Sequence, residues 1–402
     1  MAANSATVND KLKIVHVFRA PLGGLFRHVV DLAAAQRARE HDVGMFFDGD
    51  GLCPRVREAL ARIPGGLTFG VATTPIHRNP AFSDVAAMAR FVAFLERVKP
   101  DIVHGHGSKG GVYARLSALA PLSGRPIRAY TPHGGSFNYR PGTPLHRAYM
   151  FAEKLMAPLT DVFLFESAYI AGRFDALVGA RAGVRRVVAN GLSPAEFAPA
   201  QPNADAADLL YVGELRAAKG IDTLLDALAL IGCRSGAVPH TVLIGSGPDK
   251  AALSEHAREL DVDAFVSFHG QTPTREAFKL GRILVVPSRA ESMPYIVLEA
   301  AAAGVPMVAT GVGGIPEIFG PFRDRLGPAD DATNLALRLM AAIEAPAEKL
   351  RAEAAELSRH VADNFSIETM VNAVMSGYRE ALARRRPTPA AAPGATAPSP
   401  HP

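Results

Sequence analysis

Two carboxylates and the start of a helix come together in the segment SRAESMPYIVLEAAAAGVP (288–306). Glu291 lies in the loop after an apolar strand, and Pro294 suits the first turn of the following helix. That helix is apolar all round except at Glu299, where a carboxylate is costly unless a polar partner meets it. Glu299 lies about 7.5 Å along the helix axis from Pro294, so it can face the same opening as Glu291. Free N–H groups at a helix start favour phosphate, so the segment predicts a phosphorylated ligand; the alternative is that Glu299 caps a neighbouring loop.

Two cations and a glycine-rich turn are expected at the same edge of the predicted sheet. In VGELRAAKG (212–220), Arg216 and Lys219 follow an apolar strand at a spacing of three residues, where they can clamp a diphosphate. The alternative for this pair alone is a solvated surface position. The turn ATGVGGIPE (309–317) links a strand to a helix through glycines, which let a backbone approach a phosphate closely.

Three histidines end two strand candidates in the first half of the chain. His133, in TPHGG, lies next to two glycines at a strand end, where ligand-binding loops are expected. We therefore expect His133 to serve an active site, with a structural histidine as the alternative. His104 and His106, in VHGHG, have no evident third ligand in the sequence, so packing or loop hydrogen bonding is favoured over a metal site.

Short apolar runs alternate with helical segments along both halves of the chain. Strands without polar alternation, separated by helices, predict parallel sheets covered on both faces, so each half is expected to be a doubly wound α/β domain. Helical periodicity is clear at 25–38 and 82–98. The strand candidates are 13–18, 43–47, 101–106, 127–133 and 162–167 in the first half, and 209–213, 240–245, 264–270, 282–288 and 305–310 in the second.

The segment 185–206, which carries several prolines, breaks this rhythm and predicts the connection between the two domains. We expect a first domain at residues 1–190, a linker at 191–206, a second domain at 207–365 and a last amphipathic helix at 366–385. Residues 386–402 are rich in proline and alanine and are predicted to be disordered.

The composition is that of an ordinary globular protein with an uneven distribution of charge. A chain of 402 residues, 48% hydrophobic and 20% charged, suits two domains. It shows no run of about 18 apolar residues and no secretory signal, and Cys53 and Cys233 lack metal-ligand spacing, so we expect a cytoplasmic protein. Residues 1–190 carry 24 Lys and Arg against 14 Asp and Glu, a balance of +10, which leaves −6 for residues 191–402. The basic half suggests an anionic partner, and a plain difference in isoelectric point between the domains is the alternative.

In combination, these motifs resemble the retaining GT-B glycosyltransferases of glycosyltransferase family four. The resemblance rests on Glu291 and Glu299 separated by seven residues, on GELRxxKG and GVGGIPE, on Asn190–Gly191, and on APLGGLFRHV near the N-terminus. It covers about residues 12–382 and implies two Rossmann-like domains facing across a donor-binding cleft, with a C-terminal helix crossing back to the first domain. It also implies transfer of a sugar from a nucleoside-diphosphate sugar, UDP by default, to a glycan or lipid-linked saccharide in bacterial surface or exopolysaccharide synthesis.

The resemblance assigns roles to individual residues of this chain. Glu299 would hold the ribose, and Arg216 and Lys219 would neutralise the departing diphosphate. Glu291 would bind the donor sugar, and His133 would lie near the reacting centre. The remaining positions assigned to the donor lie in glycine-rich turns and in the loop after Glu291: Gly23, Gly24, Gly213, Ser292, Met293 and Pro294.

The implied reaction needs no cofactor besides the nucleotide sugar. Two Asp-x-Asp triplets, 48–50 and 261–263, have a spacing that holds a divalent cation on the diphosphate in the other large glycosyltransferase architecture. Both are typical of solvated turns, and fixed cations can replace the metal, so we predict no metal requirement. Since no carboxylate nucleophile is evident in the first domain, we expect same-face attack by the acceptor hydroxyl, whose proton goes to the leaving phosphate oxygen.

The sequence departs from the family pattern at two places. The loop after Glu291 reads SMPY instead of the commoner Gly-aromatic-Pro loop, which leaves the selectivity for the donor sugar open. The segment after GVGGIPE is compact, and Asp330 is the candidate for the acid that ends the family's longer glycine-rich turn.

The acceptor is expected on the first domain. The segment 131–156 combines aromatic residues with Arg140, Arg147 and Lys154, which suits a polyprenyl-diphosphate-linked saccharide at an anionic membrane surface. A soluble sugar acceptor is the alternative, and no nucleic acid partner is expected. Two other classes stay open: a sugar-nucleotide epimerase on the same fold and a two-lobed sugar-binding protein. A dinucleotide oxidoreductase is disfavoured because no G-x-G-x-x-G follows the first strand.

Overall fold

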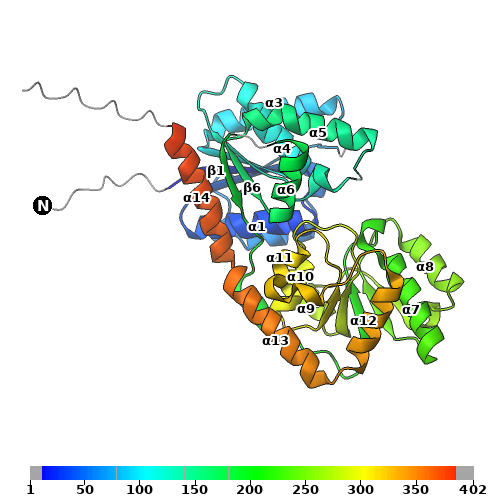
Figure 1. Cartoon of the computed structure of the whole chain (residues 1–402). Coiled ribbons are helices and arrows are strands. Elements are labelled where there is room, and N and C mark those ends of the chain that lie inside the picture. The colour runs from blue at the N-terminus through cyan, green and yellow to red at the C-terminus, as the bar shows by residue number, and fades with distance from the viewer. Residues whose placement is uncertain (1–10, 78, 140, 180–181, 386–402) are drawn as a thin grey trace, which may run out of the picture.

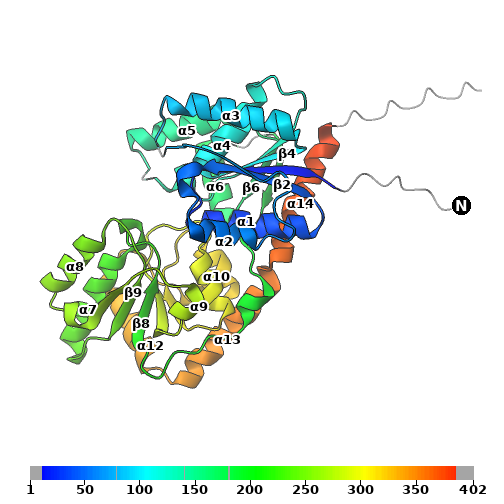
Figure 2. The same cartoon turned by 180° about the vertical axis from the view of Figure 1, so that it is seen from behind.

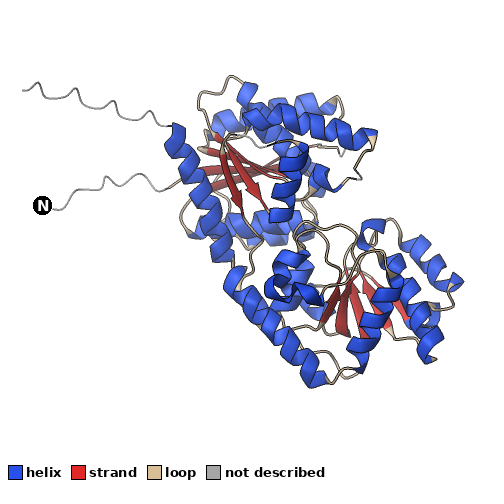
Figure 3. Ribbon diagram, in the orientation of Figure 1, coloured by secondary structure: helices blue, strands red, loops and turns tan. Residues whose placement is uncertain are grey.

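The chain forms two α/β domains, and its last helix returns to the first of them (Figure 1). The computed structural model describes residues 11–77, 79–139, 141–179 and 182–385. In each domain a sheet forms the middle layer and helices cover it on both sides (Figure 3). The paired strands of both sheets run parallel, which confirms the predicted pair of doubly wound domains.

The first domain is built on a seven-stranded sheet of order β3-β2-β1-β4-β5-β6-β7. Its strands are β1 (Lys13–Val17), β2 (Asp42–Asp48), β3 (Val71–Thr74), β4 (Ile102–His106), β5 (Ile127–Thr131), β6 (Val162–Phe165) and β7 (Val184–Val187). Its helices are α1 (Gly23–Ala38), α2 (Pro54–Ala61), α3 (Ser83–Val98), α4 (Gly107–Leu116), α5 (Pro144–Met156) and α6 (Ala168–Leu177). The central strands β1 and β4 are almost wholly buried because helices cover both of their faces.

The second domain is built on a five-stranded sheet of order β10-β9-β8-β11-β12. Its strands are β8 (Ala207–Val212), β9 (Thr241–Ile244), β10 (Val266–His269), β11 (Gly281–Val286) and β12 (Met307–Ala309). Its helices are α7 (Ile221–Ser235), α8 (Lys250–Glu259), α9 (Thr274–Ala277), α10 (Tyr295–Ala302), α11 (Ile315–Phe319), α12 (Ala332–Glu344) and α13 (Ala347–Asn364).

Two segments cross between the domains side by side. The backbone of Leu192 exchanges hydrogen bonds with Phe365 and Ile367, at 2.8 and 2.9 Å. A Cβ at Gly191 would lie 2.5 Å from the carbonyl oxygen of Ser366, so only glycine permits this approach. Helix α14 (Ile367–Arg385) then packs along the first domain (Figure 2). Its Tyr378 is completely buried there. The predicted helix crossing back to the first domain is confirmed.

Two strands of the first sheet were missing from the prediction. β3 and β7 are edge strands with the sequences VATT and VRRV, and pairing along one side needs less apolar sequence than a central position. β7 overlaps the start of 185–206, so the first residues of the segment predicted as the interdomain connection belong to the sheet. The predicted disordered tail, 386–402, lies outside the described residues. Among the described residues, no helix is both long and apolar enough to cross a bilayer.

Candidate active site at the domain interface

Lys219 and Glu291 form an ion pair at the carboxyl ends of β8 and β11. The Nζ atom of Lys219 lies 2.5 Å from Glu291 Oε1, and the same oxygen accepts a hydrogen bond from Ser288 Oγ at 2.7 Å. Gly220, with φ of 64°, brings this turn against β11, because a Cβ there would lie 2.0 Å from the oxygen of Pro287. Two of the predicted charged residues therefore meet at the expected edge of the sheet.

Arg216 lies apart from this pair. Its side chain is 45% exposed and pairs with Glu214 at 3.0 Å. The neighbouring Gly213 leaves no space for a side chain, since a Cβ would lie 2.7 Å from the hydroxyl of Tyr211. The two predicted cations therefore have different surroundings: Lys219 is half-buried against a carboxylate, and Arg216 is open to solvent.

The glycine-rich turn 309–317 packs against the loop of Glu291. Gly313 has φ of 60°, and a Cβ there would lie 1.8 Å from the carbonyl oxygen of Glu291, so only glycine fits. At the end of the turn, Glu317 reaches the first domain and accepts hydrogen bonds from the backbone N–H groups of Ala168 and Tyr169, both at 2.8 Å. The turn therefore supports the site and also joins the two domains.

Asp330, the candidate for the acid of the longer turn, lies beside Arg289 in the segment that leads to Glu291. It forms an ion pair with Arg289, which also binds Asp222 of α7 at 2.7 Å. Its position in the left-handed region, at φ of 58°, belongs to this surface network. These contacts place Asp330 beside α7, and its role as the acid of the turn stays a prediction.

Glu299 faces the first domain from helix α10. Its carboxylate pairs with Arg27 of α1, which also pairs with Glu196 and lies over the ring of Tyr295 at 4.2 Å from the centroid. Burial raises the pKa of Glu299, although the charge of Arg27 opposes the shift. Gly24, in the first turn of α1, lies directly against this ring, because a Cβ there would lie 3.3 Å from a ring carbon of Tyr295.

Gly23 precedes Gly24 in a more open position. It has φ of 62°, and a Cβ at this position would meet no atom within 4 Å. The predicted glycine-rich first loop is therefore adjacent to α10. Glycine is favoured at position 23 because the backbone there is left-handed.

The loop of His133 meets the loop of Glu291 across the interface. His133 and Gly134 both have left-handed backbones, at φ of 50° and 71°, and strain of this kind often marks functional sites. A Cβ at Gly134 would lie 3.2 Å from Cβ of Ser292, so the two loops are in contact. Behind the loop, the buried carboxylate of Glu166 accepts a hydrogen bond from the N–H of Gly134.

Asn190 connects helix α1 with the loop of Glu291 through its amide. Its Nδ2 donates to the carbonyl oxygen of Met293 at 2.8 Å, and its Oδ1 lies 3.0 Å from Nδ1 of His28. The Asn–Gly dipeptide was noted in the sequence, but this bridge between α1 and the loop 291–294 could only be seen in the fold.

Five histidines gather beneath the His133 loop. The rings of His104 and His106 lie 3.8 Å apart, and His104 is bonded to Thr131 at 2.9 Å and to the hydroxyl of Tyr378 at 2.7 Å. The predicted hydrogen-bonding role of His104 is therefore present. The other members of the cluster are His16, His28 and His133.

A third histidine lies near His106 in the fold, although the sequence made none evident. In two triplets the ring nitrogens lie within 4.8 Å of one another: His16, His104 and His106, and His28, His106 and His133. Imidazoles at this separation can hold Zn²⁺ or a similar ion. The third histidine, His16 of β1 or His28 of α1, comes from a distant part of the chain, so no local spacing could reveal it. Several of the same nitrogens are paired with one another by hydrogen bonds.

Burial keeps this cluster uncharged at neutral pH. It lowers the pKa of His16 and of His28 to about 4, and holds the pKa values of His104, His106 and His133 well below the usual range. Each ring therefore offers one N–H donor and one lone pair. The Asp-x-Asp triplets lie away from this cluster, in turns where Asp50, Asp261 and Asp263 are exposed, as predicted.

Two family models match the chain in succession. The model described as Glycosyltransferase Family 4 matches residues 22–196, and the model described as Glycosyl transferases group 1 matches residues 193–361. The chain is 28% identical to glycogen synthase of Mycobacterium tuberculosis over 395 residues, which cover 92% of this chain and 94% of that protein. It is also 28% identical to a D-inositol 3-phosphate glycosyltransferase of Saccharomonospora viridis over 275 residues, which cover 61% of this chain and 62% of that protein.

Solved structures share the whole two-domain architecture. Sucrose-phosphate synthase of Thermosynechococcus elongatus has a TM-score of 0.76 at 21% identity, over 93% of this chain and 100% of that chain. Anabaena HepE in complex with UDP and glucose has a TM-score of 0.73 at 17% identity, with the same coverage. The fold is therefore GT-B, and the chain belongs to the group 1 glycosyltransferases of glycosyltransferase family four.

Proposed function

We propose that the protein is a retaining glycosyltransferase that uses a nucleoside-diphosphate sugar and a glycan acceptor in the synthesis of bacterial surface polysaccharide or exopolysaccharide. The proposal is carried by the contact between the Glu291 loop of the second domain and the His133 loop of the first. The charged residues proposed to bind the donor thus lie opposite His133 of the first domain, which is expected to bind the acceptor. UDP is the first candidate nucleotide, supported by the HepE structure with UDP and glucose.

In this proposal the second domain binds the donor. Lys219 and Arg216 neutralise the diphosphate as charge develops on it, an interaction that is stronger in the transition state than in the ground state. Glu291 exchanges its bond to Lys219 for hydroxyl groups of the donor sugar, and Glu299 accepts from the ribose. Backbone groups close around the donor at Gly23, Gly24, Gly213, Ser292, Met293 and Pro294.

The acceptor hydroxyl attacks from the face that the diphosphate leaves. Glu166 is a buried carboxylate close to the His133 loop, but it is bonded to the backbone of that loop. Burial raises its pKa to about 7, so the group is largely protonated at mildly acidic pH and is suited to holding the loop. We therefore assign no nucleophile to the first domain, and the leaving phosphate oxygen takes the proton of the acceptor hydroxyl.

The outer face of α5 supports a lipid-linked acceptor. Leu145, Phe151 and Leu155 are 53–63% exposed on this helix, and Arg147 and Lys154 are exposed beside them. Helices of this composition lie at the bilayer surface, with apolar side chains among the lipids and cations at anionic headgroups. We propose that a cytoplasmic protein uses this face to reach a polyprenyl-diphosphate-linked saccharide at the inner membrane. Arg140 of the same segment lies outside the described residues.

The test combines nucleotide binding with the stereochemistry of the product. UDP, GDP, ADP and dTDP are compared in thermal-shift assays on the wild type, on Glu299→Ala and on a control, Glu356→Ala, which removes a surface ion pair of α13. We expect one diphosphate to stabilise the wild type and the control but not Glu299→Ala. NMR of the glycoside formed from an α-linked donor should show an α linkage. No stabilisation by any diphosphate contradicts the donor site, and a β linkage contradicts retention.

A further inference from the structure

We propose that Gln36 sets the tautomer of His133 through a chain of hydrogen bonds that passes through His16 and His106. The three residues would be positioning residues for His133, so the inference rests on the proposed function in placing His133 near the reacting centre. None of the three belongs to the predicted site, and each comes from a different element: α1, β1 and β4.

The chain is continuous and buried. Oε1 of Gln36 lies 2.8 Å from Nε2 of His16, and Nδ1 of His16 lies 2.9 Å from Nε2 of His106. Nδ1 of His106 then lies 3.1 Å from Nε2 of His133. Gln36 and His16 have no exposed surface, whereas His133 at the other end is partly exposed. The chain therefore connects the back of α1 to the surface where the two domains meet.

The direction of the chain follows from its first member. Nε2 of Gln36 faces the sulfur of Met375 at 3.9 Å, so its carbonyl oxygen faces His16 and can only accept. His16 must then donate from Nε2, which leaves its Nδ1 to accept from Nε2–H of His106. By the same rule His106 accepts at Nδ1 from Nε2–H of His133. The result is a His133 ring that carries its proton on Nε2 and a lone pair on Nδ1.

The hydrogen bonds of the chain keep this direction only while all three histidine rings are neutral. The groups around them are the edge-packed ring of His28, the ring of His104 with its partner Tyr378, and Glu166, which binds the loop backbone. None of them places a carboxylate on a ring nitrogen, and burial lowers the pKa of each histidine of the chain. A protonated ring would donate from both nitrogens and break the direction.

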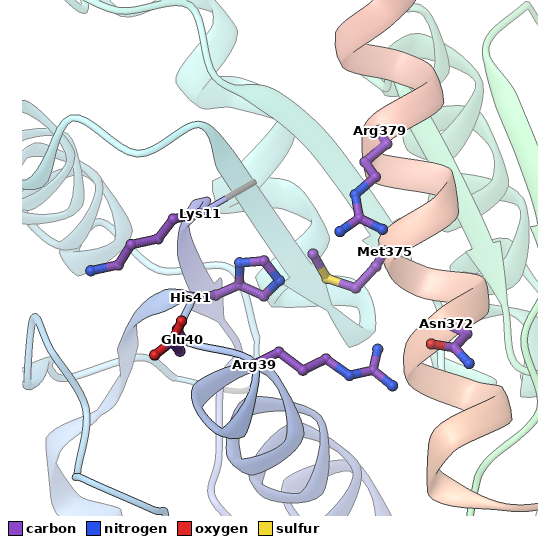
Figure 4. Close-up of a pocket in the computed structure, with 7 residues that line it drawn as sticks. All are labelled: Lys11, Arg39, Glu40, His41, Asn372, Met375 and Arg379. Carbon is purple, nitrogen blue, oxygen red and sulfur yellow. The ribbon is translucent and has the colours of Figure 1, made fainter. Parts of the chain in front are cut away.

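The Gln36 end of the chain lies next to a cavity. Met375 lines a cavity of about 530 Å³ between the end of α1 and α14 (Figure 4). Three cations, Lys11, Arg39 and Arg379, line the same cavity against one carboxylate, Glu40.

In the proposed reaction, a lone pair on Nδ1 lets His133 accept a hydrogen bond from a sugar hydroxyl, which the other tautomer could not do. The consequence is measurable without turnover, because protonated and unprotonated ring nitrogens have well-separated ¹⁵N chemical shifts. The signals of His133 are assigned by their loss in His133→Asn. In the wild type we expect a protonated Nε2 and an unprotonated Nδ1.

Gln36→Met is the decisive variant, because it keeps the size of the side chain and removes the acceptor. We expect the His133 shifts to move toward a mixture of tautomers, and kcat to fall about two- to tenfold with KM for the donor changed less than twofold. Thr131→Val is the matched control. It removes one buried hydrogen bond from His104, outside the chain, and should leave the His133 shifts unchanged.

Two results would overturn the inference: a wild-type His133 protonated on Nδ1, or unchanged His133 shifts in folded Gln36→Met. If the His133 shifts moved only because a buried hydrogen bond was lost, they would move in Thr131→Val as well. If no glycosyl transfer is found with any donor, the proposed function fails, while the ¹⁵N shifts still decide whether Gln36 controls the tautomer.

Discussion

Arg27 in the first domain forms an ion pair with Glu299 in the second, the carboxylate proposed to hold the ribose. The two side chains are 24% and 16% exposed, and Arg27 is also held by Glu196 and by the ring of Tyr295. The same guanidinium thus joins the two domains and occupies part of the proposed nucleotide site. A bound ribose must therefore share Glu299 with Arg27 or displace it.

This arrangement predicts opposite effects of Arg27→Met with and without nucleotide. Without ligand, loss of the buried contacts should lower the free energy of unfolding by about 1–2 kcal/mol. With UDP, the rise in melting temperature should be larger than in the wild type, because the ribose no longer competes with a cation. Arg185→Met, which breaks a pair with Asp175 inside the first domain, is the control. An equal UDP-induced shift in wild type and Arg27→Met would show that Glu299 does not meet the ribose.

Lys219 should matter for the rate more than for binding. If its charge stabilises the departing diphosphate, Lys219→Met should lower kcat by about 10²–10³-fold, the usual effect of removing one such donor. Lys219→Arg should recover part of the rate because it restores the charge. Steady-state kinetics with the identified donor decide the matter, with Lys250→Met on α8 as the control. A change in KM alone would mean that Lys219 binds donor and transition state equally.

Glu166 should make stability depend on pH in a defined direction. Burial raises its pKa from 4.5 to about 7, so between these values the unfolded chain is ionised while the folded protein keeps the proton. Stability is therefore lost as pH rises from 4.5 to 7, by roughly 3 kcal/mol from this group. Glu166→Gln should remove that loss while keeping an acceptor for the loop backbone.

The measurement is the difference in unfolding free energy between wild type and Glu166→Gln, by urea titration at several pH values. The difference is needed because His16 and His28 act in the opposite direction. Their pKa values fall from 6.5 to about 4 on folding, so they cost stability as pH drops through that range. A difference that stays constant from pH 4.5 to 7 would contradict the raised pKa of Glu166.

The metal prediction is tested separately, because the histidine triplets could hold an ion that the reaction does not need. We expect transfer activity to be unchanged by EDTA, because in the proposed mechanism Lys219 and Arg216 supply the positive charge for the diphosphate. The activity is measured after dialysis against EDTA and again after adding Mg²⁺, Mn²⁺ or Zn²⁺. Loss of activity in EDTA that a single divalent ion restores would refute the prediction.

Whether a contact of the candidate site could be predicted from the sequence depends on how far apart its two residues lie along the chain. Glu291 and the turn 309–317 are close in sequence and share one sheet edge, so their meeting could be predicted from the strand pattern. The partner of Glu299 is 272 residues away, and Arg27 in LFRHVV has the appearance of an ordinary surface cation on a helix. Gln36 carries no local signal at all, because its role depends on strands that are brought together only by the parallel sheet. Short polar edge strands such as β7 could not be predicted for a related reason. Pairing with the neighbouring strand stabilises them, and their own sequence does not indicate a strand.

The membrane proposal can be tested at α5 without touching the site. Phe151 and Leu155 are 63% and 62% exposed, and burying them in lipid is the apolar part of the expected affinity. We expect the wild type to co-sediment with vesicles that contain anionic lipid, and Phe151→Ser with Leu155→Ser to reduce the bound fraction at least tenfold. Thermal shift with UDP should stay unchanged in this variant, because α5 lies away from the second domain (Figure 1).

Leu337→Ser is the matched control, since Leu337 is 49% exposed on α12 of the second domain. It should bind vesicles as the wild type does. Raising the salt concentration should weaken binding if Arg147 and Lys154 contribute, because surface charges are screened over about 10 Å at 0.1 M salt. Equal sedimentation with neutral and anionic vesicles would remove the electrostatic part of the proposal. No sedimentation with either would favour a soluble acceptor, for which the exposed face of α5 would have to contact the acceptor or another protein.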